Sequence, residues 1–194
     1  SCVGVPTAQG EVAIAFAAPS GSGKSTLASA LVARGCRLLA DDLTVVSHRP
    51  ETGIHVLPTF PRVRLWRDAM ERFGYTPEAC ERVRDEMDKY SVPMMEAFTR
   101  RALPLAAIYH FSRVEDERHA ELRRVQGFEA TARFLDAIHQ RRALFYAMAA
   151  DRSAHMALIA RAVGAIPEHW MLAQQSGIAQ LDMLVARILG AHGA

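Results

Sequence analysis

The sequence predicts an α/β protein, and three observations support this class. Short apolar runs alternate with segments whose apolar residues recur at helical spacing. A glycine-rich loop at residues 18–26 stands between one such run and one such segment, and helical segments predominate after about residue 127. A chain of 194 residues has the size of one domain, here with a core over about 1–126 and a helical C-terminal part over about 127–194.

The expected strands and helices follow from the pattern of apolar residues along the chain. Strands are expected where runs are short and mostly apolar, at 1–5, 11–17, 37–40, 43–47, 54–57, 105–111 and 165–172. Helices are expected where apolar residues lie three and four apart, at 25–34, 65–73, 77–88, 128–149, 154–163 and 178–191. The stretch 90–103 has neither period, which predicts either a mobile active-site loop or a plain surface connection.

The strongest chemical signal is a phosphate-binding loop. It begins at Ala18, where the pattern usually has glycine, and continues through Pro19, Ser20, Gly21, Ser22, Gly23, Lys24, Ser25 and Thr26. Backbone N–H groups of such a loop and the positive end of the following helix dipole converge on phosphate oxygens. Lys24 is expected to reach the β- and γ-phosphates, and the Ser25 hydroxyl to bind Mg²⁺. The preceding strand and following helix favour this interpretation over a Gly/Ser loop that binds nothing.

A second signal is the pair Asp41-Asp42, which directly follows the apolar strand 37–40. Short connections are expected to place this strand beside the strand 11–17, with the carboxylates at the edge that carries the phosphate loop. Neighbours on one strand point to opposite faces and can therefore take separate roles. One carboxylate would hold Mg²⁺ and the other would accept a proton from an attacking hydroxyl, in an order that the sequence leaves open. The alternative is an Asp-Asp pair in a solvated turn.

Three cations near these signals are weaker candidates. Arg62 and Arg64 alternate on a short stretch, so both can point toward a phosphate-rich pocket, where arginine binds phosphate oxygens in pairs. Surface arginines are also common. Lys89 precedes the irregular stretch and can close on a γ-phosphate or an acidic peptide, although a solvated cation at a helix end is the simpler interpretation. Trp66 is expected to anchor the next helix on the sheet.

Taken together, these segments resemble the C-terminal domain of HPr kinase/phosphorylase and its shorter relatives, among them the serine kinases of lasso-peptide gene clusters. The resemblance is carried by residues 18–26, by Leu38-Leu39-Ala40-Asp41-Asp42 and by residues 60–66. It implies a P-loop kinase core of the HPr kinase/PEP carboxykinase type, with a mixed sheet, flanking helices and a helical C-terminal part. The larger members form ring-like assemblies, so a homo-oligomer is possible.

The resemblance also implies site roles. Gly21, Gly23, Lys24, Ser25 and Thr26 would bind ATP phosphates and Mg²⁺, and the Asp pair would supply the base and the metal-facing carboxylate. Family members use a histidine near the strand before the loop, and Ser1 lies at or just past that position. The glycine- and asparagine-rich signature of true HPr kinases is absent from the sequence, which favours the shorter, peptide-modifying branch.

The expected function is therefore transfer of the γ-phosphoryl group of ATP, with Mg²⁺, to a serine hydroxyl of a peptide or protein, such as a lasso-type precursor peptide. In that reaction the catalytic candidates are Asp41, Asp42, Lys24, Arg62 and Arg64, and the metal ligands are Ser25, Asp41 and Asp42. Two alternatives remain open. One is a small-molecule kinase, and the other is a nucleotide-dependent switch or binding module that transfers no phosphate.

Composition narrows the partners. The net charge of +2 argues against a broad nucleic-acid surface. Cys2, Cys36 and Cys80 are odd in number and lack metal-ligand spacing, so reduced thiols in a cytoplasmic protein are expected. The eight histidines also lack zinc-ligand spacing and are expected at the surface or at strand edges. No apolar run approaches the roughly 18 residues of a membrane span, and no signal-peptide pattern is present, so no membrane partner is expected.

Overall fold

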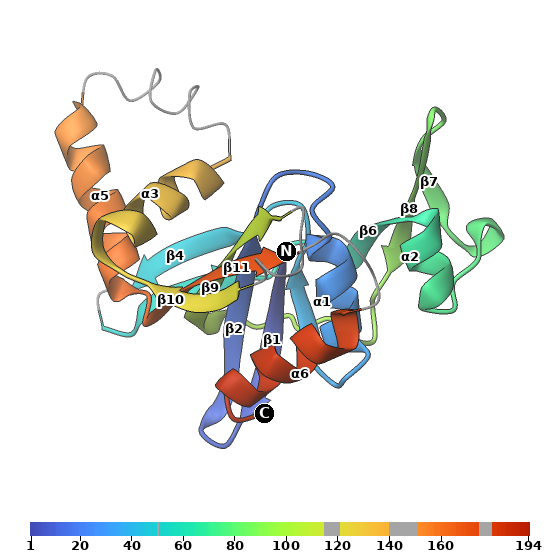
Figure 1. Ribbon diagram of the computed structural model, residues 1–194, viewed down its shortest axis with the longest axis horizontal. Helices are drawn as coiled ribbons and strands as arrows, with labels where there is room; N and C mark the ends of the chain where they lie inside the picture. Colours follow the sequence, from blue (N-terminus) through green and yellow to red (C-terminus); the bar gives the residue numbers. More distant parts are fainter. Residues whose placement is uncertain (50, 115–120, 140–150, 175–179) are drawn as a thin grey trace.

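The computed structural model describes residues 1–49, 51–114, 121–139, 151–174 and 180–194 (Figure 1). Its strands are β1 (Cys2–Thr7), β2 (Gly10–Ala17), β3 (Arg37–Ala40), β4 (Val45–Arg49), β5 (Gly53–Leu57), β6 (Arg62–Trp66), β7 (Glu81–Arg84), β8 (Met87–Pro93), β9 (Leu103–Arg113), β10 (Glu121–Val125) and β11 (Glu168–Gln174). Its helices are α1 (Lys24–Val32), α2 (Arg67–Arg72), α3 (Gly127–Ala137), α5 (Arg152–Ala165) and α6 (Leu181–Ala191), with a 3₁₀ turn η1 at Pro77–Ala79. The α/β class is confirmed.

The main sheet is mixed, as predicted. Its strand order is β10-β11-β9-β2-β1-β3, and the hairpin of β4 and β5 joins it through β5 and β9. β2, β9 and β11 run parallel to one another, whereas β1 runs antiparallel to both β2 and β3. The prediction that residues 37–40 lie directly beside β2 is wrong, because β1 is inserted between them. The loop that leaves β2 and the pair that follows β3 nevertheless emerge at the same edge of the sheet.

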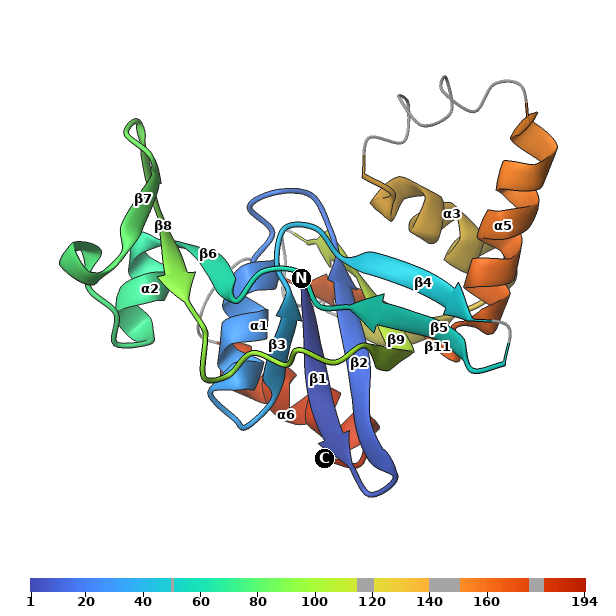
Figure 2. The same ribbon diagram turned by 180° about the vertical axis from the view of Figure 1, so that it is seen from behind.

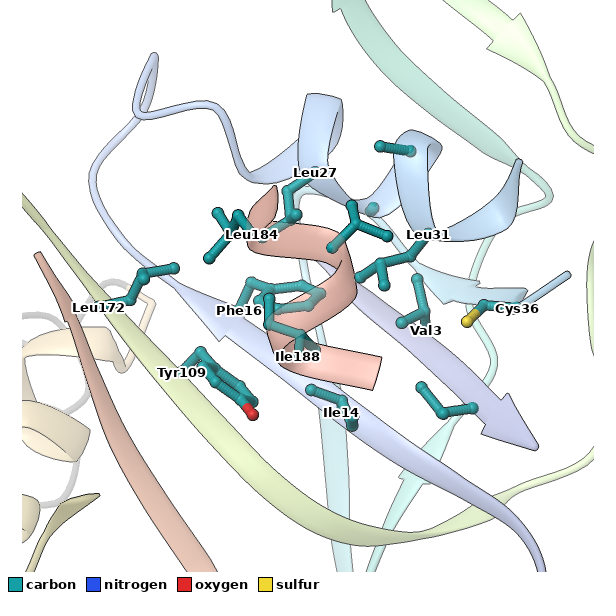
Figure 3. Close-up of a cluster of buried hydrophobic side chains, with 14 of the residues drawn as sticks. Val3, Ile14, Phe16, Leu27, Leu31, Cys36, Tyr109, Leu172, Leu184 and Ile188 are labelled. Carbon is teal, nitrogen blue, oxygen red and sulfur yellow. The ribbon is translucent and has the colours of Figure 1, made fainter. Parts of the chain in front are cut away.

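Alternation along β2 divides the core between two faces of the sheet. Ile14 and Phe16 point to the face covered by α1 and α6, where they pack with Leu31 and Ile188 (Figure 3). The alanines of β2 pack on the opposite face, with residues of β5 and α5. Figure 2 shows the backbone from that side, with the hairpin of β4 and β5 in front. Because both faces are covered, the central strands are apolar at nearly every position, which is why the sequence identified them correctly.

A second sheet, of order β6-β8-β7, lies with α2 at the other end of the molecule from α3 and α5 (Figure 1). The prediction of a helix at 77–88 is wrong, apart from the 3₁₀ turn at Pro77–Ala79. The prediction of an irregular stretch at 90–103 is wrong at its start, which belongs to β8, and holds for residues 94–102, which lie outside the helices and strands. Residues 81–93 form the hairpin of β7 and β8. β7 is an edge strand with its side chains largely exposed, so it has no alternating apolar signal. Cross-strand contacts from Arg82 to Asp88 and Tyr90 stabilise the hairpin instead.

Several other boundaries differ from the predictions. The expected helix 65–73 begins only at Arg67, because Leu65 and Trp66 complete β6. The expected helix 128–149 ends at Ala137 within the described residues, and positions 140–150 lie outside them. β10 was not predicted at all, since its Arg-rich sequence lacks an apolar face. Among the described residues, no helix is long and apolar enough to cross a membrane.

Candidate functional site

The loop between β2 and α1 ends in a helix N-terminus that is open to a ligand. Gly21 and Gly23 have φ of 80° and 92°, the left-handed region that favours glycine, although a Cβ would meet open space at both positions. These glycines are therefore required by backbone conformation. Gly23 is the N-cap of α1, and no side chain caps the helix there. The amides of the first turn and the positive end of the helix dipole favour an anion at this point.

A hydrogen bond connects this loop to the first carboxylate of the Asp pair. The Ser25 hydroxyl donates to Oδ1 of Asp41 at 2.8 Å, and the Ser1 hydroxyl donates to the same oxygen at 2.5 Å. The backbone N–H of Arg64 donates to Oδ2 at 2.8 Å. Burial alone would raise the pKa of Asp41, but these donors hold the pKa below its ordinary value. Asp41 is therefore a buried, ionised carboxylate at the foot of the loop.

Asp41 and Asp42 lie in a turn after β3, and the backbone conformation of this turn gives their side chains different positions. The sequence predicted separation by strand alternation, but β3 ends at Ala40, and Asp42 has φ of 60°, a rare conformation for a residue other than glycine. The turn is closed by the N–H of Leu43, which donates to the Asp41 carbonyl at 2.7 Å. The Asp42 carboxylate is half-exposed and forms an ion pair of 2.6 Å with the guanidinium of Arg64. The two carboxylates thus have different environments.

Lys24 lies against the start of the loop. Its Nζ donates to the carbonyls of Ala18 and Pro19, both at 2.9 Å. Burial lowers the pKa of Lys24, while Asp41 and Asp42 oppose that change. A phosphate group at the helix N-terminus would offer this ammonium a charged partner in place of two neutral carbonyls.

The loop, Asp42 and Arg64 line one end of a pocket of about 1170 Å³. We call this the loop end and define it by residues 18–26, Asp42 and Arg64, together with Asp41, which is hydrogen-bonded to Ser25. Next to it, the second sheet and α2 contribute Trp66, Asp68 and Lys89. We call the opposite part the histidine end and define it by Ile108 and His110 of β9 together with Arg133, Phe134 and Ile138, which lie on or directly after α3. The pocket therefore extends from the glycine-rich loop across the ends of β2 and β9.

The sequence did not predict the histidine end. His110, His155 and His169 were expected at the surface or at strand edges, but their exposed fractions are 3, 9 and 6%. The rings of His110 and His169 stack in parallel, with Nε2 of His110 3.4 Å from Nδ1 of His169. The alternation of side chains along a strand could have predicted this burial, because His110 lies on the same face of its strand as the buried Ile108, and His169 on the same face as the buried Met171.

The two arginines predicted together are separated by the structure. Arg64 lines the pocket and meets Asp42, whereas Arg62 does not line the pocket. The Arg62 guanidinium lies 5.2 Å from the centroid of the Phe60 ring, in a cation–π contact. Lys89 lies opposite Trp66 in the pairing of β6 and β8, so both line the pocket from the second sheet.

The donor set at the loop end fits Mg²⁺. Ser25 Oγ and Asp41 Oδ1 are oxygens, which Mg²⁺ prefers, and they lie 2.8 Å apart. Adjacent ligands in an octahedral shell with bonds of 2.0–2.1 Å are about 2.9 Å apart, so one cation could bind both oxygens. Asp42 is the neighbouring carboxylate that remains available for other chemistry.

Comparisons with known proteins give remote likenesses among solved structures alone. No protein-family model matches the chain, and no curated protein matches it. Among solved structures, the Hpr(Ser) kinase/phosphatase from Coxiella burnetii aligns with a TM-score of 0.43 and 11% sequence identity, over 98% of this chain and 86% of that one. The assignment of function therefore depends on the residues of this chain.

Proposed function

We propose that this protein is an ATP- and Mg²⁺-dependent kinase that phosphorylates a serine hydroxyl of a peptide or protein. The observation that carries the proposal is the hydrogen bond from Ser25 to Asp41, beside a second carboxylate that faces the pocket. It joins an anion-binding helix N-terminus to a metal-binding carboxylate and leaves Asp42 for proton transfer. These are the parts that phosphoryl transfer requires.

The environments of the two carboxylates support an assignment that the sequence left open. Asp41 is buried and hydrogen-bonded to Ser25, so Asp41 and Ser25 would hold Mg²⁺, which neutralises charge on the phosphate oxygens when bound. Asp42 is half-exposed and lines the pocket, so it is the base. It accepts the seryl proton as the seryl oxygen bonds to the γ-phosphorus. The bond from that phosphorus to the bridging oxygen breaks, and ADP leaves.

Two cations support the developing charge. Lys24 would exchange the carbonyls of Ala18 and Pro19 for phosphate oxygens, and Arg64 holds Asp42 while its remaining N–H groups can reach the transferred phosphoryl group. Arg62 is the weaker candidate, since its guanidinium packs on Phe60 outside the pocket.

The acceptor would approach from the second sheet. Trp66, Asp68 and Lys89 line the pocket next to Asp42 and Arg64, and Trp66 is 44% exposed. An exposed indole beside a lysine suits a peptide with an apolar and an acidic group near the acceptor serine. The narrower proposal, that the acceptor is a lasso-type precursor peptide, is supported by the sequence resemblance alone.

The test is a transfer assay with ATP labelled at the γ-phosphate, Mg²⁺ and a library of serine-containing peptides. We expect label on seryl peptides and none on the same peptides with alanine in place of serine. Free serine and glycerol are included as small acceptors. Label on these alone, or label released only as inorganic phosphate, would contradict a peptide kinase.

The variant Asp42→Asn separates catalysis from binding. We expect turnover to fall by about 100-fold or more, because a general base contributes that much. The dissociation constant of ATP, measured by calorimetry, should change by less than about threefold, since Asn retains the size of the side chain. An unchanged turnover would remove Asp42 from the proposed mechanism and favour a nucleotide-binding module.

A further inference from the structure

In the buried pair of His110 and His169, the surroundings determine which ring nitrogens donate hydrogen bonds and which accept them. Nε2 of His169 lies 3.2 Å from the carbonyl oxygen of Val163, and Nδ1 of His169 faces Nε2 of His110 at 3.4 Å. A carbonyl can only accept, so Nε2 of His169 carries the proton. Burial lowers the pKa of His169, and burial together with the nearby His169 and Arg133 lowers the pKa of His110 to about 4. Both rings are therefore neutral at pH 7.

Because both rings are neutral, the proton positions on the remaining ring nitrogens are also determined. A neutral imidazole carries one N–H, so Nδ1 of His169 is an acceptor and Nε2 of His110 must donate to it. This leaves Nδ1 of His110 without a proton. No residue in the described part of the chain is seen to hydrogen-bond to that nitrogen, and His110 is one of the residues that line the pocket. The Val163 carbonyl thus determines, through two rings, that Nδ1 of His110 is a hydrogen-bond acceptor.

The position of His110 relates this acceptor to the loop end. His110 pairs with Ala17 in the parallel ladder of β2 and β9, next to the first residue of the loop. The metal-binding carboxylate Asp41 lies on the other side of β2, beyond β1. A triphosphate bound with its γ-phosphate toward Asp41 and Asp42 therefore has its base toward β9 and α3. There Ile108, Phe134 and Ile138 provide apolar surface for a planar ring.

We propose that His110 Nδ1 is a specificity-determining acceptor for the exocyclic amino group of a nucleobase, with His169 as the residue that fixes its tautomer. The proposal rests on the proposed function, because it assumes that the loop end holds the phosphates of a nucleotide. Adenine and cytosine present an amino group at the corresponding ring position, whereas hypoxanthine, guanine and uracil present a carbonyl oxygen. A carbonyl opposite Nδ1 leaves two acceptors facing each other in a buried site, which costs binding free energy.

The experiment compares matched nucleotide pairs by calorimetry: ATP with ITP, and CTP with UTP. Within each pair the charge is the same and an oxo group replaces an amino group. We expect ATP to bind about tenfold to 100-fold more tightly than ITP, and CTP to show the same preference over UTP. Inorganic triphosphate is the probe for the loop end alone. Triphosphate and nucleotides that all fail to bind would overturn both the proposed function and this inference.

Three variants locate the preference. His110→Gln can offer either an amide oxygen or an amide N–H, so we expect the ATP/ITP ratio to fall to within about threefold of one while triphosphate affinity is unchanged. His169→Phe keeps a ring but removes the acceptor for His110, and we expect it to reduce the ratio in part. His139→Gln is the control, because His139 is exposed at the same pocket and should leave the ratio unchanged. Equal ATP and ITP affinities in the wild-type protein, with triphosphate bound, would overturn the inference alone.

A spectroscopic measurement does not depend on the variants. Long-range ¹⁵N–¹H correlation spectra of histidine-labelled protein distinguish the two neutral tautomers. We expect both His110 and His169 to carry the proton on Nε2, and the Nδ1 resonance of His110 to shift when ATP is added but not when triphosphate is added. A proton on Nδ1 of His110 would overturn the inference.

Discussion

The two ends of the pocket are built on different physical principles. The loop end is charged, and its hydrogen bond from Ser25 to Asp41 joins positions that are 16 apart in the chain. The buried pair of the histidine end is neutral, and the hydrogen bond between its two rings crosses from β9 to β11 over 59 positions. The first arrangement is prepared to receive phosphate charge, and the second is prepared to distinguish donors from acceptors. We therefore expect binding strength and ligand identity to be separable in this protein.

The largest effect is expected from Asp41→Asn at the loop end. Asp41 accepts hydrogen bonds on both oxygens. In the Asn variant the amide oxygen can still accept from the N–H of Arg64, and the Ser1 and Ser25 hydroxyls must turn to accept from the amide N–H₂. We expect turnover to fall by about 1000-fold, because the proposed Mg²⁺ site loses its buried carboxylate. Stability should fall by about 1 kcal/mol, because hydrogen bonds to a charged acceptor are replaced by weaker neutral ones. Transfer assays and urea unfolding measure the two effects.

The ATP/ITP ratio of this variant is the internal comparison. If the two ends are separable, the ratio remains as in the wild-type protein even though both affinities fall. A ratio that collapses together with turnover would mean that the ends act as one unit.

The same contrast explains what the sequence could predict. The strand, loop and helix around Gly23 are contiguous, and the requirement for left-handed glycine and a free helix N-terminus is local, so the sequence alone identified them. The Asp pair was recognised for the same reason. The tautomer of His110 depends on the Val163 carbonyl and on the pairing of β9 with β11, and no local pattern encodes either.

The second sheet illustrates a different limit. The sequence of β7 is mostly charged and suits a helix as well as an exposed strand, and pairing with β8 decides between the two. In β6, the spacing of Arg62 and Arg64 correctly indicated a shared side, but only the packing of Arg62 on Phe60 separates their positions. Local residue types therefore identified the candidates, and tertiary contacts distinguished between them.

The next largest effect concerns pH. The ordinary pKa of histidine is 6.5, and burial lowers that of His110 to about 4, so between these values the unfolded chain binds a proton that the folded chain does not. The contribution of His110 to the free energy of unfolding is therefore complete above pH 6.5, and up to about 3 kcal/mol of it is lost as the pH decreases to 4. Asp41 affects stability over a different pH range. Its pKa is lowered from 3.8, so its contribution is lost only as the pH falls below that value.

Urea unfolding at several pH values checks this order. We expect His110→Gln to remove the His110 share of the loss between pH 6.5 and 4, to leave the share of His169 and His192, whose pKa values are also lowered by burial, and to leave the loss at lower pH in place. Asp41→Asn should do the reverse. Parallel curves for the wild-type protein and His110→Gln would mean that His110 is charged or solvated in the folded state.

A smaller effect is expected from Arg64→Ala. This variant removes the ion pair with Asp42 and one cation near the transferred phosphoryl group, so turnover should fall by about 10- to 30-fold. Arg62→Ala is the matched comparison, since it is two residues away on the same strand but packs on Phe60. We expect it to change turnover by less than about twofold. The opposite ranking in a steady-state assay would return Arg62 to the catalytic residues.

The smallest effect is a difference in salt dependence. Raising the ionic strength from about 0.05 M to about 0.5 M screens the attraction between phosphates and Lys24, so ATP, ITP and triphosphate should all bind about fivefold more weakly. The contact of a base with His110 involves no net charge, and ATP and ITP carry equal charges, so their affinity ratio should stay constant within about twofold. Calorimetric titrations at the two salt concentrations measure both quantities. A ratio that falls with salt would assign the discrimination to a charged group such as Arg133, which lines the same end of the pocket, instead of to the neutral histidine pair.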